Sequence, residues 1–200
     1  MSWLIRDARI VPGDGSPPLR GSLRIEGESI AELGPELEPR SGETVLEADG
    51  RVLLPGFVDA HTHAVFAGDR LDEFEQLQQG RSYLEILAAG GGILSSVRAV
   101  RQASEEELAR GLGERLQLML EHGTTSVEVK SGYGLTTRDE LKLLRAIVRA
   151  GRRFPGTVVA TALLGHALDP EQPHFVDRVV EETLPAVHAE FPGVAVDAFC

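Results

Sequence analysis

The feature that most constrains the fold is a regular alternation of strand and helix patterns that begins at Pro55. Short apolar runs cover 57–63, 124–130 and 157–164, a fourth begins at Val194, and amphipathic helical patterns separate them. Strands that alternate with helices of this length pair in parallel, because each connection must cross over the sheet. The alternation therefore predicts an α/β fold with a parallel sheet.

Capping signals mark where the helices begin. Ser104 and Glu107 form an S-x-x-E capping box ahead of a leucine-rich apolar face. Thr137 and Glu140 have the same spacing and predict a second capped helix, and a third helix is predicted over 175–190. These helices fill the intervals between the predicted strands, as crossover connections require.

The number of strands indicates which parallel architecture forms. Four strands in about 145 residues are half of an eight-stranded (β/α) barrel, which typically needs about 250 residues. Residues 1–54 instead show short strand patterns separated by glycine and proline turns, which predict a small β-domain or half of one. We expect this β-domain at 1–54 and the first half of a TIM-like (β/α)8 barrel at 55–200, apparently truncated inside its fourth strand. A doubly wound open sheet is the alternative, although no glycine-rich phosphate turn follows any strand.

Charge and composition narrow the possible partners. The 31 acidic and 20 basic residues give a net charge of −11, which disfavours nucleic acid and anionic membranes. No run of eighteen apolar residues is present, and the first residues do not show the pattern of a secretory signal. Cys200 is the only cysteine, so neither an intrachain disulfide nor a thiolate zinc cluster can form. A soluble cytoplasmic protein is expected.

The strongest chemical signal is the sequence Asp59-Ala60-His61-Thr62-His63 at the end of the first strand of the alternating region. Alternate side chains of a strand share a face, so both imidazoles are predicted to point the same way, about 6 to 7 Å apart along the backbone. Two converging imidazoles can bind one Zn2+ or Fe2+, and barrel enzymes carry their active sites at this end of the strands. We interpret His61 and His63 as metal ligands; two histidines on an exposed edge are the alternative.

Other polar residues follow the predicted strands on the same rim. His166 comes directly after the third strand, and Tyr133 stands between two glycines after the second, where its hydroxyl can reach a substrate oxygen. Arg70 lies beyond the histidine pair, where a guanidinium suits a substrate carboxylate. The ordinary interpretations are a loop histidine, an aromatic plug in a turn and surface pairing of Arg70 with a neighbouring aspartate. Lys130 ends the second strand and is interpreted as a solvated charge, although a lysine there can act as a base or a metal-bridging carbamate.

These motifs resemble those of a known family. Residues 54–63 (LPGFVDAHTH) are similar to the signature of the amidohydrolase superfamily. Residues 65–70 (VFAGDR), 90–95 (GGGILS) and 128–135 (EVKSGYGL) resemble more specifically the branch of that superfamily that opens an imidazolone ring in histidine degradation. The similarity runs over nearly all 200 residues but over only about half of the usual length of the family.

The resemblance implies a composite β-sandwich domain, a (β/α)8 barrel, one bound zinc or iron (Fe2+ or Fe3+) ion per subunit, and usually a homodimer. It implies hydrolysis of a cyclic amide C–N bond, converting 4-imidazolone-5-propanoate to N-formimidoyl-L-glutamate by attack of a metal-activated water. By matching motifs, the metal ligands would be His61 and His63, and the substrate-binding residues Arg70, Tyr133 and His166, with Tyr83 a weaker candidate.

The resemblance also defines what the chain is expected to lack. The family's later metal-binding histidine and aspartate, and its proton-shuttling carboxylate, would fall beyond Cys200, so the chain alone is expected to be inactive and prone to association through open sheet edges. The chain has Gly165-His166 where the family commonly has Gly-Ala-His. Other amidohydrolases (dihydroorotase-, hydantoinase- or guanine-deaminase-like) and a non-catalytic scaffold of the same fold are the alternatives.

Overall fold

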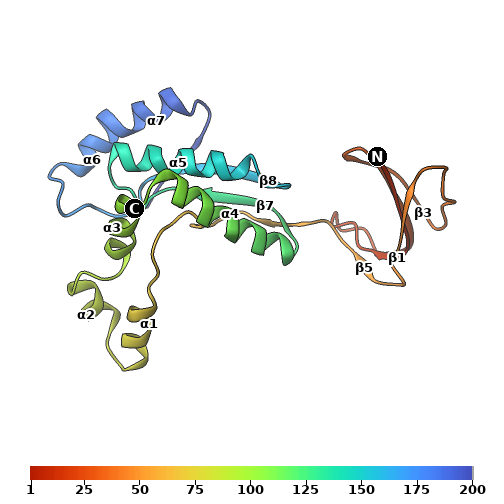
Figure 1. Cartoon of the computed structure of the whole chain (residues 1–200), viewed down its shortest axis with the longest axis horizontal. Helices are drawn as coiled ribbons and strands as arrows, with labels where there is room; N and C mark the ends of the chain where they lie inside the picture. Colours follow the sequence, from red (N-terminus) through yellow and green to blue (C-terminus); the bar gives the residue numbers. More distant parts are fainter. Residues whose placement is uncertain (200) are drawn as a thin grey trace. The chain divides into compact units, whose positions relative to one another are not determined.

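The computed structural model describes residues 1–199 and divides into two compact units, Met1–Gly56 and Phe57–Cys200. Cys200 itself lies outside the described residues. Within the described residues, the first unit contains strands only, and every helix belongs to the second (Figure 1). Circular dichroism of the helices therefore reports on the second unit alone.

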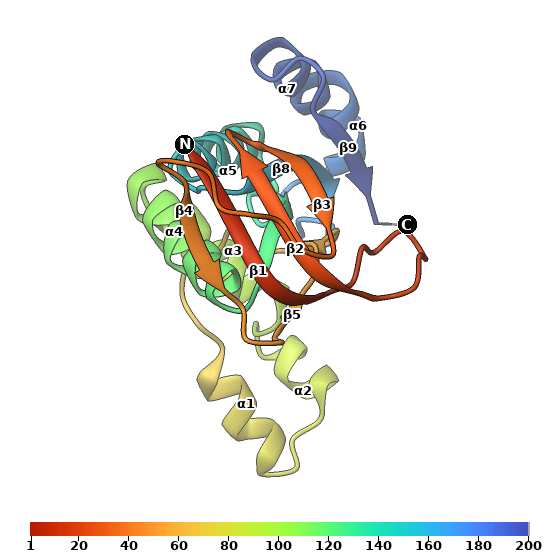
Figure 2. The same ribbon diagram turned by 90° about the vertical axis from the view of Figure 1, so that its right-hand side faces the viewer.

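The first unit is a five-stranded sheet built around β1 (Ser2–Ile10). On one side of β1 lies antiparallel β2 (Leu19–Glu26), followed by β3 (Ser29–Gly34); on the other side lie β4 (Thr44–Glu47) and β5 (Val52–Leu53), both parallel to β1. Figure 2 shows β3, β2, β1 and β4 in this order. The strand patterns over 4–11, 22–26, 29–33 and 44–48 in the sequence predict the first four strands. Strand β5 has two residues, too few to show an alternating pattern.

A buried ion pair accompanies the small apolar core of this sheet. Arg24 on β2 is 2% exposed and donates from Nε to Glu43 Oε1 at 2.8 Å, and it also pairs with Glu32. The hydrogen bond from Arg24 lowers the pKa of Glu43 to about 2, against the opposing effect of burial. The buried apolar cluster of the same unit contains Ala8, Ile10, Leu23 and Ala48.

The second unit is built on a curled, parallel sheet of four strands that follow one another in sequence order. These are β6 (Phe57–Asp59), β7 (Thr124–Lys130), β8 (Thr157–Gly165) and β9 (Ala195–Ala198). The predicted half-barrel with consecutive parallel strands is confirmed. Within the described residues β6 and β9 are the two edges, each paired on one side only.

Two long helices, α4 (Glu105–Glu121) and α5 (Thr137–Gly151), cover one face of this sheet (Figure 1). Leucines spaced along α4 are buried against Val127 and Val129 of β7, so alternate residues of that strand face the helices. The predicted capping box at Ser104 is present. The helical chain over 175–190 is also present, as α6 (Phe175–Arg178), a π-helical segment (Val179–Thr183) and α7 (Leu184–Glu190).

The second predicted capping box is wrong. The N-cap of α5 is Thr136, whose side chain accepts from the backbone N–H of Asp139 at 3.1 Å. The cap is therefore one residue earlier than the predicted Thr137. The residue three positions after the capping threonine is Asp139 and not Glu140. Glu140 takes no part in the cap, and its carboxylate accepts hydrogen bonds from the loop before the helix instead.

Three shorter helices connect β6 to α4: α1 (Leu71–Gln78), α2 (Tyr83–Ala88) and α3 (Ile93–Gln102). Taken as one stretch, residues 83–102 are long and apolar enough to cross a membrane, with a mean hydropathy of 1.2. They do not form one helix, because Gly90 and Gly92 adopt positive φ and break the stretch into α2 and α3. Such a broken stretch is weak evidence for a membrane span.

Candidate metal and substrate site

The histidine pair follows β6 but lies outside the strand itself. β6 ends at Asp59, earlier than the predicted 57–63, and beyond it Thr62 provides the contacts to β7. The Thr62 hydroxyl donates to the carbonyl of Glu128 at 2.7 Å, and the Thr62 carbonyl accepts from the N–H of Lys130 at 3.0 Å. The threonine between the histidines is therefore buried against β7, which holds the segment in place beyond the end of the regular ladder.

Four rings from three strand ends meet at the carboxyl edge of the sheet. The ring centroids of His61 and His63 are 5.3 Å apart, and His63 stacks on His166 with centroids 4.5 Å apart and an interplanar angle of 17°. The Tyr133 ring lies 5.9 Å from His63 and 5.0 Å from His166. The direct Gly165-His166 connection therefore brings this imidazole into the cluster. The structure gathers four of the five predicted site residues.

The donor set of the histidine pair fits a zinc or iron ion. His63 Nδ1 is buried and has no hydrogen-bond partner among residues 1–199. Burial, followed by the nearby imidazoles of His166 and His61, lowers the pKa of His63, which favours the neutral ring that binds metals. Within the described part of the chain no group of three or more histidine, cysteine, aspartate or glutamate residues is arranged to hold an ion. Two imidazoles can supply only part of the coordination shell that such an ion needs.

His166 and Tyr133 have defined hydrogen-bonding roles. The Nδ1 of His166 lies 3.2 Å from the carbonyl of Gly132, and since a carbonyl only accepts, Nδ1 carries the proton. Burial lowers the pKa of His166, so in the neutral ring Nε2 is an acceptor. Burial also raises the pKa of Tyr133, which keeps its hydroxyl protonated and able to donate. One acceptor and one donor thus stand beside the histidine pair.

Arg70 lies outside the ring cluster. It is the N-cap residue of α1, and its Nε donates to Glu73 at 2.7 Å. The hydrogen bond with Glu73 raises the pKa of Arg70, and a contact with the Tyr83 hydroxyl adds to this. The positive charge of Arg70 opposes the rise in the pKa of Tyr133, so Arg70 interacts electrostatically with the ring cluster. The partner is Glu73 rather than a neighbouring aspartate, and the Arg70 side chain remains 42% exposed.

The interpretation of Lys130 as a solvated charge is wrong. The residue is 7% exposed, and its Nζ lies 2.8 Å from Glu128 and 3.0 Å from Asp197 of β9. The hydrogen bond to Glu128 raises the pKa of Lys130, while Glu128 stays below its usual pKa because hydrogen bonds outweigh its burial. Polar residues alternate with valines in β7, so this pair occupies the face opposite the helices, a pattern that the strand sequence already contains.

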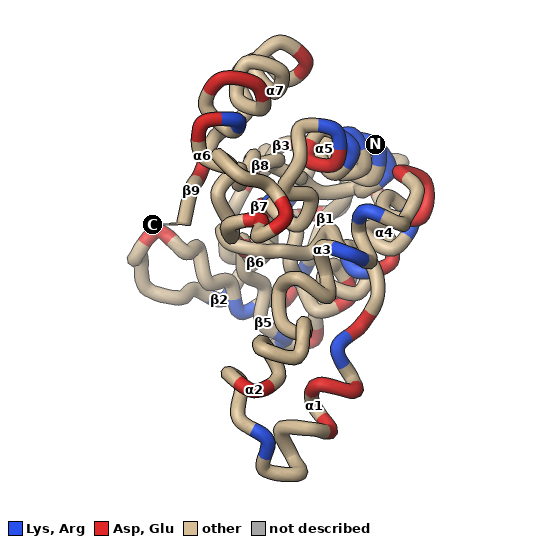
Figure 3. Tube along the Cα trace, turned by 90° about the vertical axis from the view of Figure 1, so that its left-hand side faces the viewer, with Lys and Arg blue, Asp and Glu red and all other residues tan. Residues whose placement is uncertain are grey.

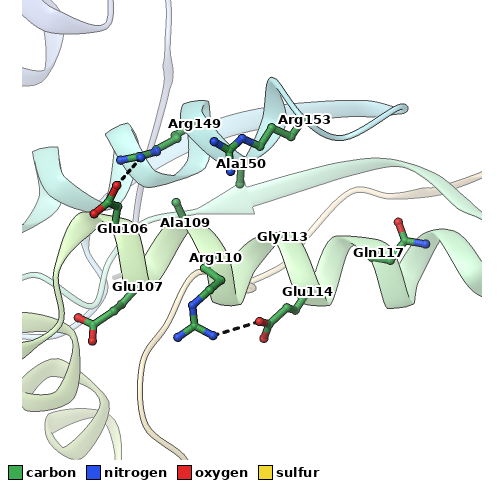
Figure 4. Close-up of a pocket in the computed structure, with 10 residues that line it drawn as sticks. All are labelled: Glu106, Glu107, Ala109, Arg110, Gly113, Glu114, Gln117, Arg149, Ala150 and Arg153. Atoms are coloured by element: carbon green, nitrogen blue, oxygen red, sulfur yellow. Dashed lines mark hydrogen bonds and ion pairs between the residues drawn. The ribbon is translucent and has the colours of Figure 1, made fainter.

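Among residues 57–199, the helical side of the second unit has no comparable cluster of rings. A hollow of about 790 Å3 lies between α4 and α5, and four of its charged residues form two ion pairs, Arg149 with Glu106 and Arg110 with Glu114 (Figure 4). Acidic and basic positions are interspersed along α4 and α5 (Figure 3). A second, largely apolar hollow of about 480 Å3 reaches His166 between β8, α6 and β9.

The comparisons relate the chain to two groups of proteins. No protein-family model matches it. Curated relatives are the imidazolonepropionases of Pseudomonas aeruginosa strain UCBPP-PA14 (48% identity over 185 residues, 90% of this chain and 46% of the relative) and of Symbiobacterium thermophilum (50% over 202 residues, 96% and 45%). The chain spans about half the length of these relatives.

Solved structures give the same fold at lower identity. Atrazine chlorohydrolase TrzN from Arthrobacter aurescens TC1, complexed with zinc, superposes with a TM-score of 0.62 at 19% identity, over 98% of this chain and 46% of its own. N-isopropylammelide isopropylaminohydrolase from Burkholderia multivorans gives 0.57 at 22%, over 92% and 43%. The curled parallel sheet is therefore the fold of these two hydrolases. By sequence, the chain is similar to the imidazolonepropionases over about half of their length.

Proposed function

We propose that this chain forms part of a metal-dependent hydrolase that converts 4-imidazolone-5-propanoate and water to N-formimidoyl-L-glutamate. The carrying observation is that His61, His63, Tyr133 and His166 converge at one sheet edge in a chain homologous to imidazolonepropionases. We further propose that this hydrolase is a cytoplasmic homodimer with one zinc or iron ion per subunit.

The roles of the residues follow from their hydrogen-bonding states. His61 and His63 would hold the metal ion, which when bound supplies a nucleophilic water near neutral pH. The neutral His166 would accept a ring N–H of the substrate at Nε2, and Tyr133 would donate to a substrate oxygen. Arg70 would bind the propionate by sharing its guanidinium donors between Glu73 and the substrate carboxylate.

The remaining groups are proposed to come from outside residues 1–199. Two imidazoles do not complete a catalytic site, which normally has three protein ligands and an open position. The proton-shuttling carboxylate is likewise assigned to no described residue. We therefore propose that the chain alone is inactive and that the part of the relatives that it does not span supplies both functions.

Metal binding tests the proposed role of His61 and His63 as ligands. Co2+ titrated into the wild-type chain should bind at one equivalent, and either His61→Ala or His63→Ala should weaken binding by at least tenfold. His188→Ala, an exposed histidine on α7, is the matched control and should bind as the wild type does. Co2+ binding that survives both site substitutions would contradict the ligand assignment and favour a scaffold.

Substrate turnover tests the proposed reaction. The chain is co-expressed with the part of the Pseudomonas aeruginosa relative that it does not match, and product formation from 4-imidazolone-5-propanoate is followed alongside a panel of uncharged cyclic amides. We expect turnover of the propanoate, abolished by His63→Ala and reduced in kcat/KM by Arg70→Met. Turnover of the uncharged amides in its place would assign the site to a different amidohydrolase activity.

A further inference from the structure

Glu140 is a buried carboxylate with an unusual set of partners. It lies in the first turn of α5, is 1% exposed, and faces the loop that joins β7 to that helix. Its Oε1 accepts from the N–H groups of Gly134 at 2.7 Å and Leu135 at 2.9 Å, and its Oε2 accepts from the N–H of Gly132 at 2.9 Å. One side chain thus takes three backbone donors from the loop that carries Tyr133.

The backbone conformation of the loop makes this convergence possible. Gly132 and Leu135 have φ of 112° and 54°, which turn successive N–H groups towards one point. The carbonyl groups of the loop accept hydrogen bonds from other side chains. His166 donates to Gly132, Arg101 donates to Gly134 at 3.0 Å, and Gln172 donates to Leu135 at 2.8 Å. The main-chain polar groups around Tyr133 are therefore fixed on both sides.

The loop also packs without free space against its neighbours. A Cβ added at Gly132 would lie 3.0 Å from the Cβ of His166, and one added at Gly134 would lie 2.6 Å from the backbone carbon of Asp139. A shift of the loop relative to α5 would thus change the positions of both Tyr133 and the His166 ring that it contacts.

We propose that Glu140 is a positioning residue that fixes Tyr133 and His166 together for substrate binding, acting through the backbone of residues 132–135. The effect on substrate binding rests on the proposed function, whereas the positioning of the loop rests on the hydrogen bonds of Glu140. These hydrogen bonds go to the loop backbone and not to either ring, so Glu140 acts on the rings through the position of the loop.

The chemistry of the carboxylate suggests a selective test. Burial raises the pKa of Glu140, and hydrogen bonds from Ser131 and the loop amides oppose that rise. A glutamine has the same shape but only one accepting atom, so it can satisfy the Gly134 and Leu135 amides while its own NH2 faces the N–H of Gly132. Glu140→Gln should therefore release the loop at Gly132, the residue that contacts His166.

The experiment compares Glu140→Gln with Asp139→Asn in the full chain. Asp139 is the matched control, because it is also buried in the first turn of α5 but bonds to Thr136 and Lys142 rather than to the loop. We expect Glu140→Gln to move the amide resonances of Gly132 and to abolish the nuclear Overhauser contacts between Tyr133 and His166, whereas Asp139→Asn retains both. Unchanged contacts in folded Glu140→Gln would overturn the proposal.

A second variant and a binding measurement complete the test. Should Glu140→Gln fail to fold, Gly132→Ala displaces the same loop from the opposite side, and preserved contacts between the two rings there would equally refute the inference. Binding of 4-imidazolone-5-propanoate should weaken roughly tenfold in Glu140→Gln, about the loss expected for one charge-assisted hydrogen bond. This binding is measured on the chain co-expressed with the missing part of the relative. No binding by that wild-type assembly would count against the proposed function, while the ring contacts still decide the role of Glu140.

Discussion

Removing the positive charge of Lys130 should destabilise the second unit strongly. Lys130→Met keeps an unbranched chain of similar length but leaves Glu128 without its cationic partner. The Glu128 side chain is 14% exposed and the Lys130 side chain 8%, so water replaces the lost interaction poorly. Asp197 is 44% exposed and is largely solvated in either case.

The magnitude follows from the contacts that remain. Breaking a buried ion pair by removing one partner costs about 3–5 kcal/mol. Glu128 retains hydrogen bonds from the N–H of Thr62 and from Thr161, so we expect the lower end, about 3 kcal/mol. Adding Glu128→Gln to Lys130→Met removes the orphaned charge and should restore stability to within about 1 kcal/mol of the wild type.

Urea unfolding followed by circular dichroism at 222 nm measures this change, because the described helices all belong to the second unit. Arg149→Met is the matched control, since the Arg149–Glu106 pair is exposed and should contribute less than about 1 kcal/mol. The reasoning would be refuted if Lys130→Met were as stable as the control, or if the double variant were no more stable than the single one.

The pH dependence of the same pair has a definite sign. The lowered pKa of Glu128 means that its contribution is present above its unfolded pKa and is lost as pH falls through the folded value. The raised pKa of Lys130 means that its contribution is present below its unfolded pKa and is lost as pH rises through the folded value. The difference between wild type and Lys130→Met should therefore be largest around neutral pH and shrink on both sides.

Three further outcomes can be measured on the chain alone. Leu112→Ala, at a fully buried position of α4, should lower the free energy of unfolding by about 2–5 kcal/mol, whereas Leu118→Ala, 55% exposed, should change it by less than about 0.5 kcal/mol; urea titration checks both. The lowered pKa of Glu43 makes the stability of the first unit decrease as the pH falls from 4.5 to about 2. Glu43→Gln should therefore make the stability of this unit less dependent on pH in that range, as followed by Trp3 fluorescence. The open edges of β6 and β9 should cause concentration-dependent self-association, and a monomer at high concentration in light scattering would contradict this.

The sequence was sufficient where the deciding contacts are local. The strand over 124–130 has the predicted bounds, and the Ser104 capping box forms as its spacing indicates. The β6 strand is shorter than predicted because its length depends on pairing with β7, which lies far away in sequence. The Thr137 capping box fails for a local reason instead: Thr136 and Asp139 offer the same spacing one residue earlier.

The candidate site shows the same division. The histidine pair stands out because both residues belong to one short motif, whereas one of the two ion-pair partners of Lys130, Asp197, lies in another strand. Glu140 carries no signal of its own in a helix sequence, since its three donors come from a loop whose shape is fixed only in the folded state. The alternation of polar and apolar residues in β7 is the sequence signal that could have placed Glu128 and Lys130 on one face, away from the helices.

The contacts around β7 explain how residues from three strands can share one site. Thr62 attaches the histidine segment to the backbone of β7, and Glu140 attaches the loop that continues from the end of β7. That loop in turn fixes His166 through the carbonyl of Gly132. Each ring of the cluster is therefore positioned relative to the same strand. The contacts of Thr62 and Glu140 would remain after a substitution of the ring residues, whereas the contact with the Gly132 carbonyl is made by the His166 ring itself.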